Sequence, residues 1–390
     1  MIDLEVTEER LRKKDITLTA APVLTGLGEK YQADQRKWQG IPSIEISPGG
    51  RLWAAFYTGG ADEGKDNFVL LKKSDDYGKT WSDPIAAVDP PDEVRAFDQC
   101  LWFDPDGRLW LFWAQSLGGF DGRAGVFGAF CQDHEDKAEQ WSAPVRIGDG
   151  VMLNKPIVCS DGEWLFPVAL WKRFPSAFNP DQPRALSNVY SSSDHGKTFQ
   201  YKGGIAIPGR YYDESVLVEK KNGLLWMLVR CEDGVGQAFS KDGGKTWENP
   251  GKSDIPGPNS RFQVMRLRSG NLLMVNHQPE NGLYRPNPDE EFFYIRSQLT
   301  AYLSCDDGKT WSKQLLLDER DGVSYPDVAQ DDNGDIYIIY DYNRYKDMEI
   351  LMAVIVILIT VIVLKLSKHR QIFHIVSIND CMAVAEISLV

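Results

Sequence analysis

The chain has 390 residues, of which 43% are hydrophobic and 25% are charged, so it is long and apolar enough to bury one or two globular cores. Its 43 lysines and arginines are outnumbered by 56 aspartates and glutamates, and the net charge of -13 argues against the basic face that nucleic-acid binding requires. The six cysteines form no closely spaced pair and the five histidines show no metal-ligand spacing. We therefore predict no disulfide framework, no metal site and no cofactor.

Residues 1–35 precede the first regular pattern and are predicted to form an N-terminal arm. The first 14 residues are charged and contain no apolar segment of the kind found in a signal peptide. No cleavable signal peptide is predicted in this sequence, and a cytoplasmic location is favoured.

From residue 36 onward, one pattern recurs six times: a turn that ends in glycine, followed by a strand-like run of apolar and aromatic residues. The copies are spaced by roughly 45 to 65 residues, which is the length of a repeating structural unit. The chain also has 12 Trp, 15 Tyr and 17 Phe, which favour strands. The glycines that end the six turns are Gly50, Gly107, Gly162, Gly223, Gly270 and Gly334.

A second pattern, Ser-x-Asp-x-Gly-x-Thr followed by an aromatic residue, lies between copies of the first. It predicts a hairpin turn, because Asp accepts hydrogen bonds from its own loop, Gly adopts a positive φ and Thr begins a strand. The aromatic residue is expected to pack between neighbouring sheets. The four copies begin at Ser74, Ser192, Ser240 and Ser304, and the residues Trp141 to Pro144 follow an eroded fifth copy.

Six units of this length, each with about four short strands, predict an all-β fold, namely a six-bladed β-propeller over residues 36–354. A β-sandwich is the alternative, but it does not account for two interleaved repeats in register. The aspartates of the four turns are predicted to be structural rather than ligands.

The repeat pattern stops near Val354. The run from Ile350 to Leu364 has 15 residues without a charge, fewer than the ~20 that span a bilayer, and it is rich in strand-forming Ile and Val. We predict that residues 350–354 end the last blade. Residues 355–390 are predicted to form an atypical apolar C-terminal tail, and membrane association is not expected.

The repeats and the residues between them resemble the Asp-box (BNR repeat) proteins, and in particular the sialidases, which are exo-α-neuraminidases built on a six-bladed propeller. The resemblance extends from about Trp38 to Ala353. It implies a retaining exo-glycosidase that removes terminal acidic sugars from glycoconjugates, with a glycan or small molecule as its partner and without a cofactor.

The resemblance also implies site residues: a nucleophilic tyrosine with a glutamate partner, an acid/base aspartate, and three arginines that bind the substrate carboxylate. Tyr325, in Val-Ser-Tyr-Pro-Asp, matches the nucleophile, and Glu214, in Tyr-Asp-Glu-Ser-Val, matches its partner. Arg230 and Arg296 match the second and third arginines.

The chemistry of a sialoside explains why these residue types belong together. Its anomeric carbon carries a carboxylate, so a neutral phenol approaches without the repulsion that an anionic nucleophile would meet. A phenol with a pKa of about 10 needs a base, which the glutamate supplies. The planar forks of arginine bind the carboxylate with two hydrogen bonds each.

The acid/base residue is expected in the loop ahead of the strand that leads into the first box. This loop contains three acidic residues, and Asp62 is favoured over Glu63 and Asp66.

One departure from the family concerns the first arginine. Sialidases begin with an Arg-Ile-Pro motif, and this chain has Gly40-Ile41-Pro42 instead. Losing the hydrogen bonds of one guanidinium to a charged group removes about 1.5–3 kcal/mol per bond. Either another arginine replaces it, with Arg36, Arg210 and Arg261 as the candidates, or the substrate is a different acidic sugar.

Other polar residues lie at the starts of predicted inner strands, where propeller sites gather. We include Asp98, Gln99 and Lys155, together with Arg210 and Arg261, among the candidate substrate-binding residues. The alternative for each is a solvated strand end or a local ion pair.

Three functions remain open on the sequence. The first is a sialidase-type exo-glycosidase in which Asp62 protonates the leaving oxygen and Tyr325 attacks with Glu214 as its base. The second is a glycosidase or lyase for another acidic sugar, such as a uronate, because Gly40 interrupts the arginine set. The third is a non-catalytic glycan-binding propeller, since a fold does not determine a function.

Overall fold

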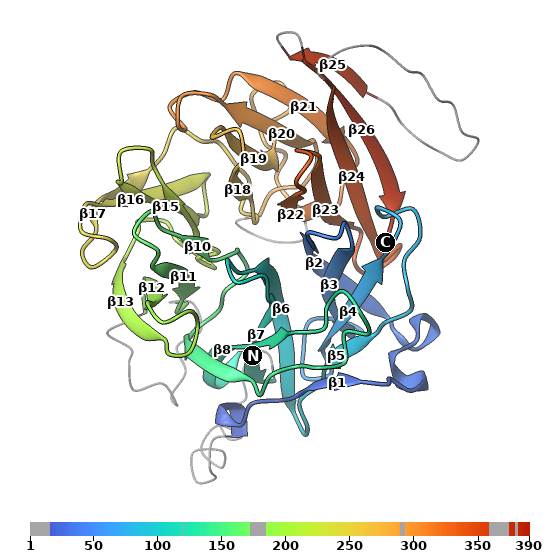
Figure 1. Cartoon of the computed structure of the whole chain (residues 1–390). Helices are drawn as coiled ribbons and strands as arrows, with labels where there is room; N and C mark the ends of the chain where they lie inside the picture. Colours follow the sequence, from blue (N-terminus) through green and yellow to red (C-terminus); the bar gives the residue numbers. More distant parts are fainter. Residues whose placement is uncertain (1–15, 119, 172–184, 289–292, 359–373, 379–380) are drawn as a thin grey trace.

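Six antiparallel sheets follow one another around a ring in this computed structural model, which describes residues 16–118, 120–171, 185–288, 293–358, 374–378 and 381–390 (Figure 1). Each sheet begins with a strand near the axis of the ring and continues outward by hairpins. The protein is therefore the predicted six-bladed β-propeller. Within the described residues, no helix has the length and hydrophobicity needed to span a bilayer.

The first three sheets run in chain order from the axis outward. Sheet 1 consists of β2 (Trp38–Ile46), β3 (Leu52–Gly59), β4 (Phe68–Ser74) and β5 (Ala86–Val88), with β1 (Val23–Thr25) paired to β5. Sheet 2 consists of β6 (Val94–Phe103), β7 (Leu109–Leu117), β8 (Asp121–Cys131) and β9 (Val145–Asp149). Sheet 3 consists of β10 (Ile157–Val158), β11 (Trp164–Ala169), β12 (Ser187–Ser192) and β13 (Gln200–Ile205).

The other three sheets complete the ring. Sheet 4 consists of β14 (Val216–Glu219), β15 (Leu225–Arg230), β16 (Val235–Ser240) and β17 (Glu248–Lys252). Sheet 5 consists of β18 (Gln263–Arg266), β19 (Leu272–His277), β20 (Leu299–Ser304) and β21 (Lys313–Asp318). Sheet 6 consists of β22 (Val323–Gln330), β23 (Ile336–Tyr342), β24 (Glu349–Leu358), β26 (Cys381–Leu389) and β25 (His374–Ile378).

The two ends of the chain extend the sheets. The segment predicted as an N-terminal arm contains β1 and three short 3-10 helices, Ile16–Leu18, Glu29–Tyr31 and Ala33–Gln35. The predicted boundary at residue 354 falls within β24, and β26 pairs with β24 from Leu351 opposite Leu389 onward. Of the predicted N-terminal arm and C-terminal tail, residues 1–15, 359–373 and 379–380 lie outside the described residues.

The six glycine-ended turns each join the first and second strands of one sheet, as the repeat predicts. All six glycines have φ between 77° and 95°, a region that residues with a side chain rarely adopt. The turns therefore specify where each inner strand ends and its hairpin partner begins.

Hydrophobic side chains fill the spaces between neighbouring sheets. The aromatic residue of each box lies in the space toward the preceding sheet: Trp81 between sheets 6 and 1, Phe199 between 2 and 3, Trp247 between 3 and 4, and Trp311 between 4 and 5. Sheets 6 and 1 share one hydrophobic cluster that includes Ile339 and Ile44, and this packing closes the ring.

In every box the aspartate accepts hydrogen bonds from the amide and hydroxyl of the following threonine. For Asp242 these bonds are 2.9 Å from Thr246 N and 2.6 Å from Thr246 Oγ1. They lower the pKa of Asp76, Asp194 and Asp242 to about 2. The four aspartates thus act within their own turns, which supports the structural interpretation.

Substitution of one box aspartate tests this role. We expect Asp242→Ala to lower the midpoint of thermal unfolding by about 1–3 °C at pH 7. Because the folded-state pKa lies below the unfolded value of about 3.9, the stabilisation is complete above pH 4 and is lost as the pH falls from about 4 to about 2. Thermal unfolding followed between pH 2 and pH 7 measures this. Asp233→Ala removes only a surface ion pair with Lys252 and serves as the control. If the two substitutions lowered the midpoint of thermal unfolding equally, or if their midpoints still differed at pH 2, the structural role of the box aspartate would be contradicted.

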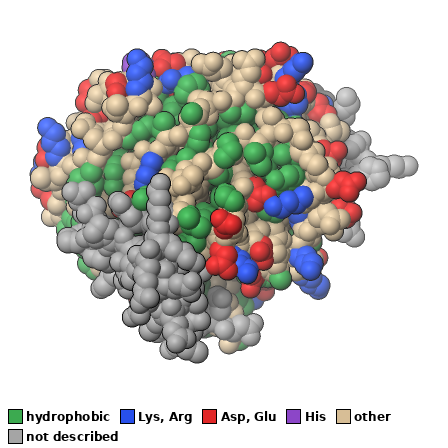
Figure 2. All heavy atoms as spheres, turned by 90° about the horizontal axis from the view of Figure 1, so that it is seen from below, with side chains coloured by type: hydrophobic (Ala, Val, Ile, Leu, Met, Phe, Trp, Pro, Cys, Tyr) green, Lys and Arg blue, Asp and Glu red, His purple; other side chains and the backbone are tan. Residues whose placement is uncertain are grey.

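On one face of the molecule, charged side chains of both signs are interspersed (Figure 2). On the face shown in Figure 2, acidic and basic groups surround a central band of hydrophobic side chains. The acidic composition is thus spread over this face rather than gathered at one place.

Candidate active site

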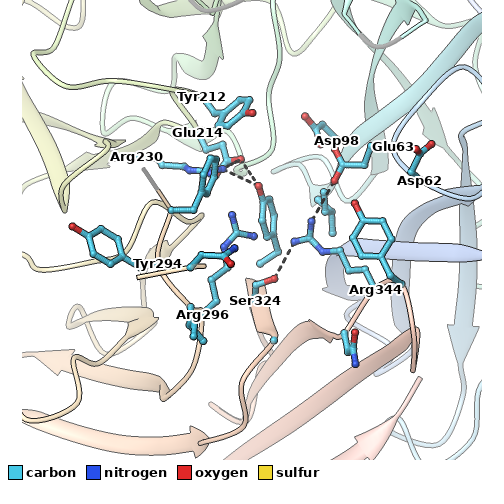
Figure 3. A pocket seen from close by; sticks show the side chains of 18 of the residues that line it. Asp62, Glu63, Asp98, Tyr212, Glu214, Arg230, Tyr294, Arg296, Ser324 and Arg344 are labelled. Carbon is cyan, nitrogen blue, oxygen red and sulfur yellow. Dashed lines mark hydrogen bonds and ion pairs between the residues drawn. The ribbon is translucent and has the colours of Figure 1, made fainter. Parts of the chain in front are cut away.

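A cavity of about 680 Å³ opens at one end of the ring and receives residues from several sheets. Tyr325 lies near the start of β22, Glu214 just before β14, Arg296 just before β20, Arg230 at the end of β15, and Arg344 after β23. In antiparallel sheets, the starts of the first and third strands and the end of the second strand lie on the same side. This topology collects residues that are distant in sequence at one mouth of the propeller (Figure 3).

Three inner strands share a backbone irregularity that faces the cavity. Ile41, Asp98 and Tyr325 have φ of 56°, 48° and 54°, and each lies where its strand slips in register against its neighbour. Such bulges turn a side chain away from the regular alternation. A left-handed residue other than glycine costs on the order of 1–3 kcal/mol, so the surrounding structure must hold it in place.

The buried carboxylate of Asp341 holds two of these bulges. It accepts hydrogen bonds from Ile41 N at 2.7 Å and from Ser324 Oγ at 2.6 Å. It also accepts a hydrogen bond of 2.8 Å from Arg344 Nε. One side chain of sheet 6 therefore organises the inner strands of sheets 1 and 6 beside the cavity.

Tyr325, Glu214 and Arg230 form a hydrogen-bonded unit at the centre of the site. The Tyr325 hydroxyl donates to Glu214 Oε1 at 2.8 Å, and Arg230 donates to the same carboxylate oxygen at 2.7 Å. Arg230 also donates to the phenol oxygen at 2.8 Å. All three side chains are buried, with Tyr325 6% exposed.

The phenol is protonated in this arrangement. Burial raises the pKa of Tyr325, and this outweighs the lowering by the nearby Arg230, Arg296 and Arg344. For Arg230, burial lowers the pKa, but Glu214, Tyr325 and Tyr212 together raise it by more, so the guanidinium stays charged. In this geometry the Glu214 carboxylate is placed to accept the proton of the Tyr325 phenol.

Two further guanidinium groups lie against the Tyr325 ring. The Cζ atoms of Arg344 and Arg296 are 4.1 Å and 5.2 Å from the ring centroid. In Figure 3, Arg344 lies on the side of Glu63 and Asp98, and Arg296 lies on the side of Arg230 and Tyr294. Within the part of the chain that the structure describes, the cavity is thus lined by four arginines and four carboxylates, and three of the guanidinium groups gather around the Tyr325 side chain.

The acidic loop between β3 and β4 brings Asp62 and Glu63 to the rim of the same cavity. Asp62 is exposed, while Glu63 lies 3.4 Å from Arg344 Nη1. Asp66 does not line this cavity. The structure thus leaves two carboxylates of the loop in position to reach a ligand.

Asp98 also lines the cavity, from the bulge on β6. Its side chain is buried, and among the described residues its carboxylate makes no hydrogen bond or ion pair. Burial raises the pKa of Asp98 well above its usual range, and Glu63 adds to this effect. A buried carboxyl that faces the cavity in this way is suited to bind a hydroxyl or amide of a ligand.

Four predicted site residues do not line the cavity: Arg261, Lys155, Gln99 and Arg210. Arg261 donates to Asn154 Oδ1 at 2.9 Å and to Leu153 O at 2.9 Å. Lys155 bonds Glu45 at 2.9 Å and lies 3.2 Å from Asp327. These charges tie inner strands together below the cavity.

The other two of the four are held by backbone and local contacts. Gln99 donates to the carbonyls of Ile41 and Ala55. Arg210 pairs with Asp213, the residue before Glu214, and donates to the carbonyl of Ala185. Gln99 follows the cavity-facing Asp98 by one residue within the bulge, and its amide is directed to these two backbone carbonyls instead of the cavity. This explains why only one of the two reaches the cavity.

Arg344 is an arginine beside Tyr325 that the sequence analysis missed. It follows the strand after the sixth glycine-ended turn without any motif, and none of the three arginines proposed to replace the family's first arginine lines the cavity. Arg95 and the aromatic residues Phe120, Trp171, Tyr212 and Phe293 also line the cavity and were not predicted. Their sequence signal is no stronger than that of ordinary propeller core residues.

Comparisons with known proteins agree with this architecture. The family of BNR repeat-like domains matches residues 50–338. The chain is 24% identical to a sialidase from Bacteroides fragilis (strain YCH46) over 362 residues, which cover 81% of this chain and 62% of that protein. The chain thus spans less than two thirds of the length of this curated relative.

Among solved structures, a protein of unknown function from Dyadobacter fermentans DSM 18053 superposes with a TM-score of 0.62 at 16% identity. The match covers 95% of this chain and 99% of that one. A leech intramolecular trans-sialidase superposes with a TM-score of 0.61 at 14% identity, over 88% of this chain and 70% of that one. At such identities the superpositions show the shared fold alone.

Proposed function

Because the chain belongs to the family of BNR repeat-like domains, we propose that its cavity is the active site of a sialidase-type exo-glycosidase acting on terminal acidic sugars. The observation that carries the proposal is the buried unit of Tyr325, Glu214 and Arg230 beside two further guanidinium groups. The similarity to a curated sialidase supports the same reaction class.

The charges of the site suit a substrate with a carboxylate on its anomeric carbon. Arginine forks at the cavity mouth attract such an anion, whereas a carboxylate nucleophile would repel it. The neutral phenol of Tyr325 avoids that repulsion. Glu214 remains close enough to remove the phenol proton as the oxygen begins to bond to carbon, at 2.8 Å.

In the first step, the Tyr325 oxygen attacks the anomeric carbon and its proton passes to Glu214. The bond to the leaving oxygen breaks, and this oxygen takes a proton from Asp62. In the second step, water attacks the anomeric carbon and gives its proton to Asp62, while the Tyr325 oxygen leaves and recovers its proton from Glu214. Two displacements at one carbon give overall retention of configuration.

The role of Asp62 predicts a dependence on the leaving group. A sugar alcohol needs protonation to leave, whereas a nitrophenolate does not. We therefore expect Asp62→Asn to lower kcat/KM for a sialyl-lactose type of substrate by about 10²- to 10⁴-fold and to leave the first step with a nitrophenyl sialoside nearly unchanged.

Asp66→Asn, on the same loop but outside the cavity, is the matched control and should behave as the unmodified protein. Kinetics with both substrates measure the effect. If Glu63→Gln gives the leaving-group dependence and Asp62→Asn does not, the acid is Glu63.

The experiment that tests the function is turnover of a panel of acidic aryl glycosides that includes sialosides and uronosides. The proposal predicts cleavage of sialosides. Cleavage of uronosides but not of sialosides would show that the substrate is a uronate and not a sialic acid. Binding of the sugars without turnover by the intact protein would show that it is a glycan-binding propeller and not an enzyme.

A further inference from the structure

Arg344 reaches the cavity by crossing the inner strand of the first sheet. Its guanidinium is anchored to Asp341 by Nε at 2.8 Å and to Ser324 Oγ by Nη2 at 3.0 Å. Among the residues that the structure describes, the remaining nitrogen, Nη1, has only a long contact of 3.4 Å with Glu63 at the rim. The side chain is thus fixed on one edge and has N–H donors left for a ligand on the other.

Gly40 makes this path available. A Cβ atom at position 40 would lie 2.6 Å from Arg344 Cδ and 2.8 Å from Arg344 Cγ, closer than carbon atoms approach each other. Gly40 does not have a positive φ, so the backbone itself does not require glycine there. What requires the glycine is the space that Arg344 occupies.

The other two arginines differ in how many donors they keep. Four of the five N–H groups of Arg230 are engaged, because its Nε and Nη2 bond Asn259 and its Nη1 bonds Glu214 and Tyr325. Arg296 makes one hydrogen bond of 3.2 Å to Asn259 O. The donors available to an anion next to the Tyr325 hydroxyl therefore come mainly from Arg296 and Arg344.

We propose that Gly40 and Arg344 form one functional pair, in which Gly40 provides the space and Arg344 supplies a guanidinium that binds the substrate carboxylate together with Arg296. The arginine absent from the first sheet is thus replaced from the sixth. Glu63 is the counter-ion of Arg344 in the structure and gives way to the substrate carboxylate on binding. The inference rests on the proposed function and adds to it the residue and the substrate class.

The arrangement selects among acidic sugars. Arg296 and Arg344 lie against the ring of the nucleophile, so a carboxylate bound between them sits next to the carbon that Tyr325 attacks. A sugar with its carboxylate on the anomeric carbon meets this requirement. A uronate carries its carboxylate on the carbon across the ring oxygen from the anomeric carbon, not on the anomeric carbon itself, and does not.

Equilibrium binding tests the pair independently of turnover. Calorimetric titration with N-acetylneuraminic acid and with its methyl ester compares a charged with a neutral group at the same position. We expect the protein to prefer the acid, and we expect Arg344→Gln and Gly40→Ala each to weaken acid binding by about 10- to 100-fold, with ester binding nearly unchanged.

Two further variants distinguish a role in carboxylate binding from a general loss of folded structure. Gly251→Ala places a Cβ where no atom lies within 4 Å, and it should bind as the unmodified protein does. The double variant Gly40→Arg/Arg344→Gly returns an arginine to the first sheet and should recover acid binding relative to either single variant.

The outcomes distinguish the inference from the function on which it rests. Hydrolysis of sialosides with acid binding that does not depend on Arg344 and Gly40 overturns the inference and leaves the function. Acid binding that depends on both residues, without hydrolysis, overturns the function and leaves the inference. Absence of both binding and hydrolysis overturns both.

Discussion

Replacing Tyr325 with phenylalanine is expected to lower kcat/KM for a sialoside by at least about 10³-fold, equivalent to about 4 kcal/mol of transition-state stabilisation. The substitution removes the attacking oxygen and the hydrogen bond of 2.8 Å to Glu214. It retains the aromatic ring against which Arg344 and Arg296 lie, so the site should keep its shape. Steady-state kinetics measure the loss.

The stereochemistry of the remaining activity adds a second observation. Without the phenol oxygen, water must attack the anomeric carbon directly, which gives inversion instead of retention. Proton NMR of the first-formed sugar reports the difference. Tyr337→Phe, on the neighbouring strand β23 and outside the cavity, is the control. Full turnover with retention in the Tyr325→Phe variant would exclude Tyr325 as the nucleophile.

Replacing Glu214 with glutamine is expected to lower kcat by about 10²- to 10⁴-fold, because the amide cannot take the phenol proton. The amide oxygen can still accept the hydrogen bond from Arg230, so the loss of stability should be smaller than for Glu214→Ala. The alanine variant leaves Arg230 buried without its carboxylate, and breaking such a pair costs about 3–5 kcal/mol.

Kinetics and thermal unfolding of both Glu214 variants separate the two effects. Glu219→Gln is the matched control, since Glu219 lies on the same segment and bonds Ser160 outside the cavity. If Glu214→Gln turns over at the normal rate, another group must serve as the base for Tyr325.

The fold follows from local sequence because its turns are local structures. The box that begins at Ser240 closes on itself through Asp242, Gly244 and Thr246, and the glycine turns need only a positive φ. Both kinds of turn can be recognised within a few residues. Their repetition gives the number of blades without any knowledge of the contacts between blades.

Local sequence patterns predict only part of the candidate site. Tyr325 and Glu214 are 111 residues apart, and a family motif was needed to associate them. The left-handed residues Asp98 and Tyr325 lie where inner strands meet other blades, through the bond of Gln99 to Ile41 and that of Tyr325 to Glu214. No local pattern indicates this backbone conformation.

Arg344 is the clearest example of a site residue that the sequence does not predict. Its position depends on a missing Cβ at Gly40, 304 positions earlier in the chain, and on a carboxylate at Asp341 that also bonds Ile41. The sequence indicates that an arginine is missing from the first strand. Only the three-dimensional arrangement indicates which residue takes its place.

The most direct test of a tyrosine nucleophile is to trap the sugar on the enzyme. A sialic acid with fluorine at C2 and C3 has a good leaving group, and its second fluorine slows the release of the sugar by destabilising the positively charged transition state. Peptide mapping by mass spectrometry after incubation with this reagent locates the adduct. The proposed mechanism predicts one sugar attached to the peptide that contains Tyr325, and its absence from the Tyr325→Phe variant. An adduct on another residue, or rapid turnover of sialosides without any adduct, would contradict it.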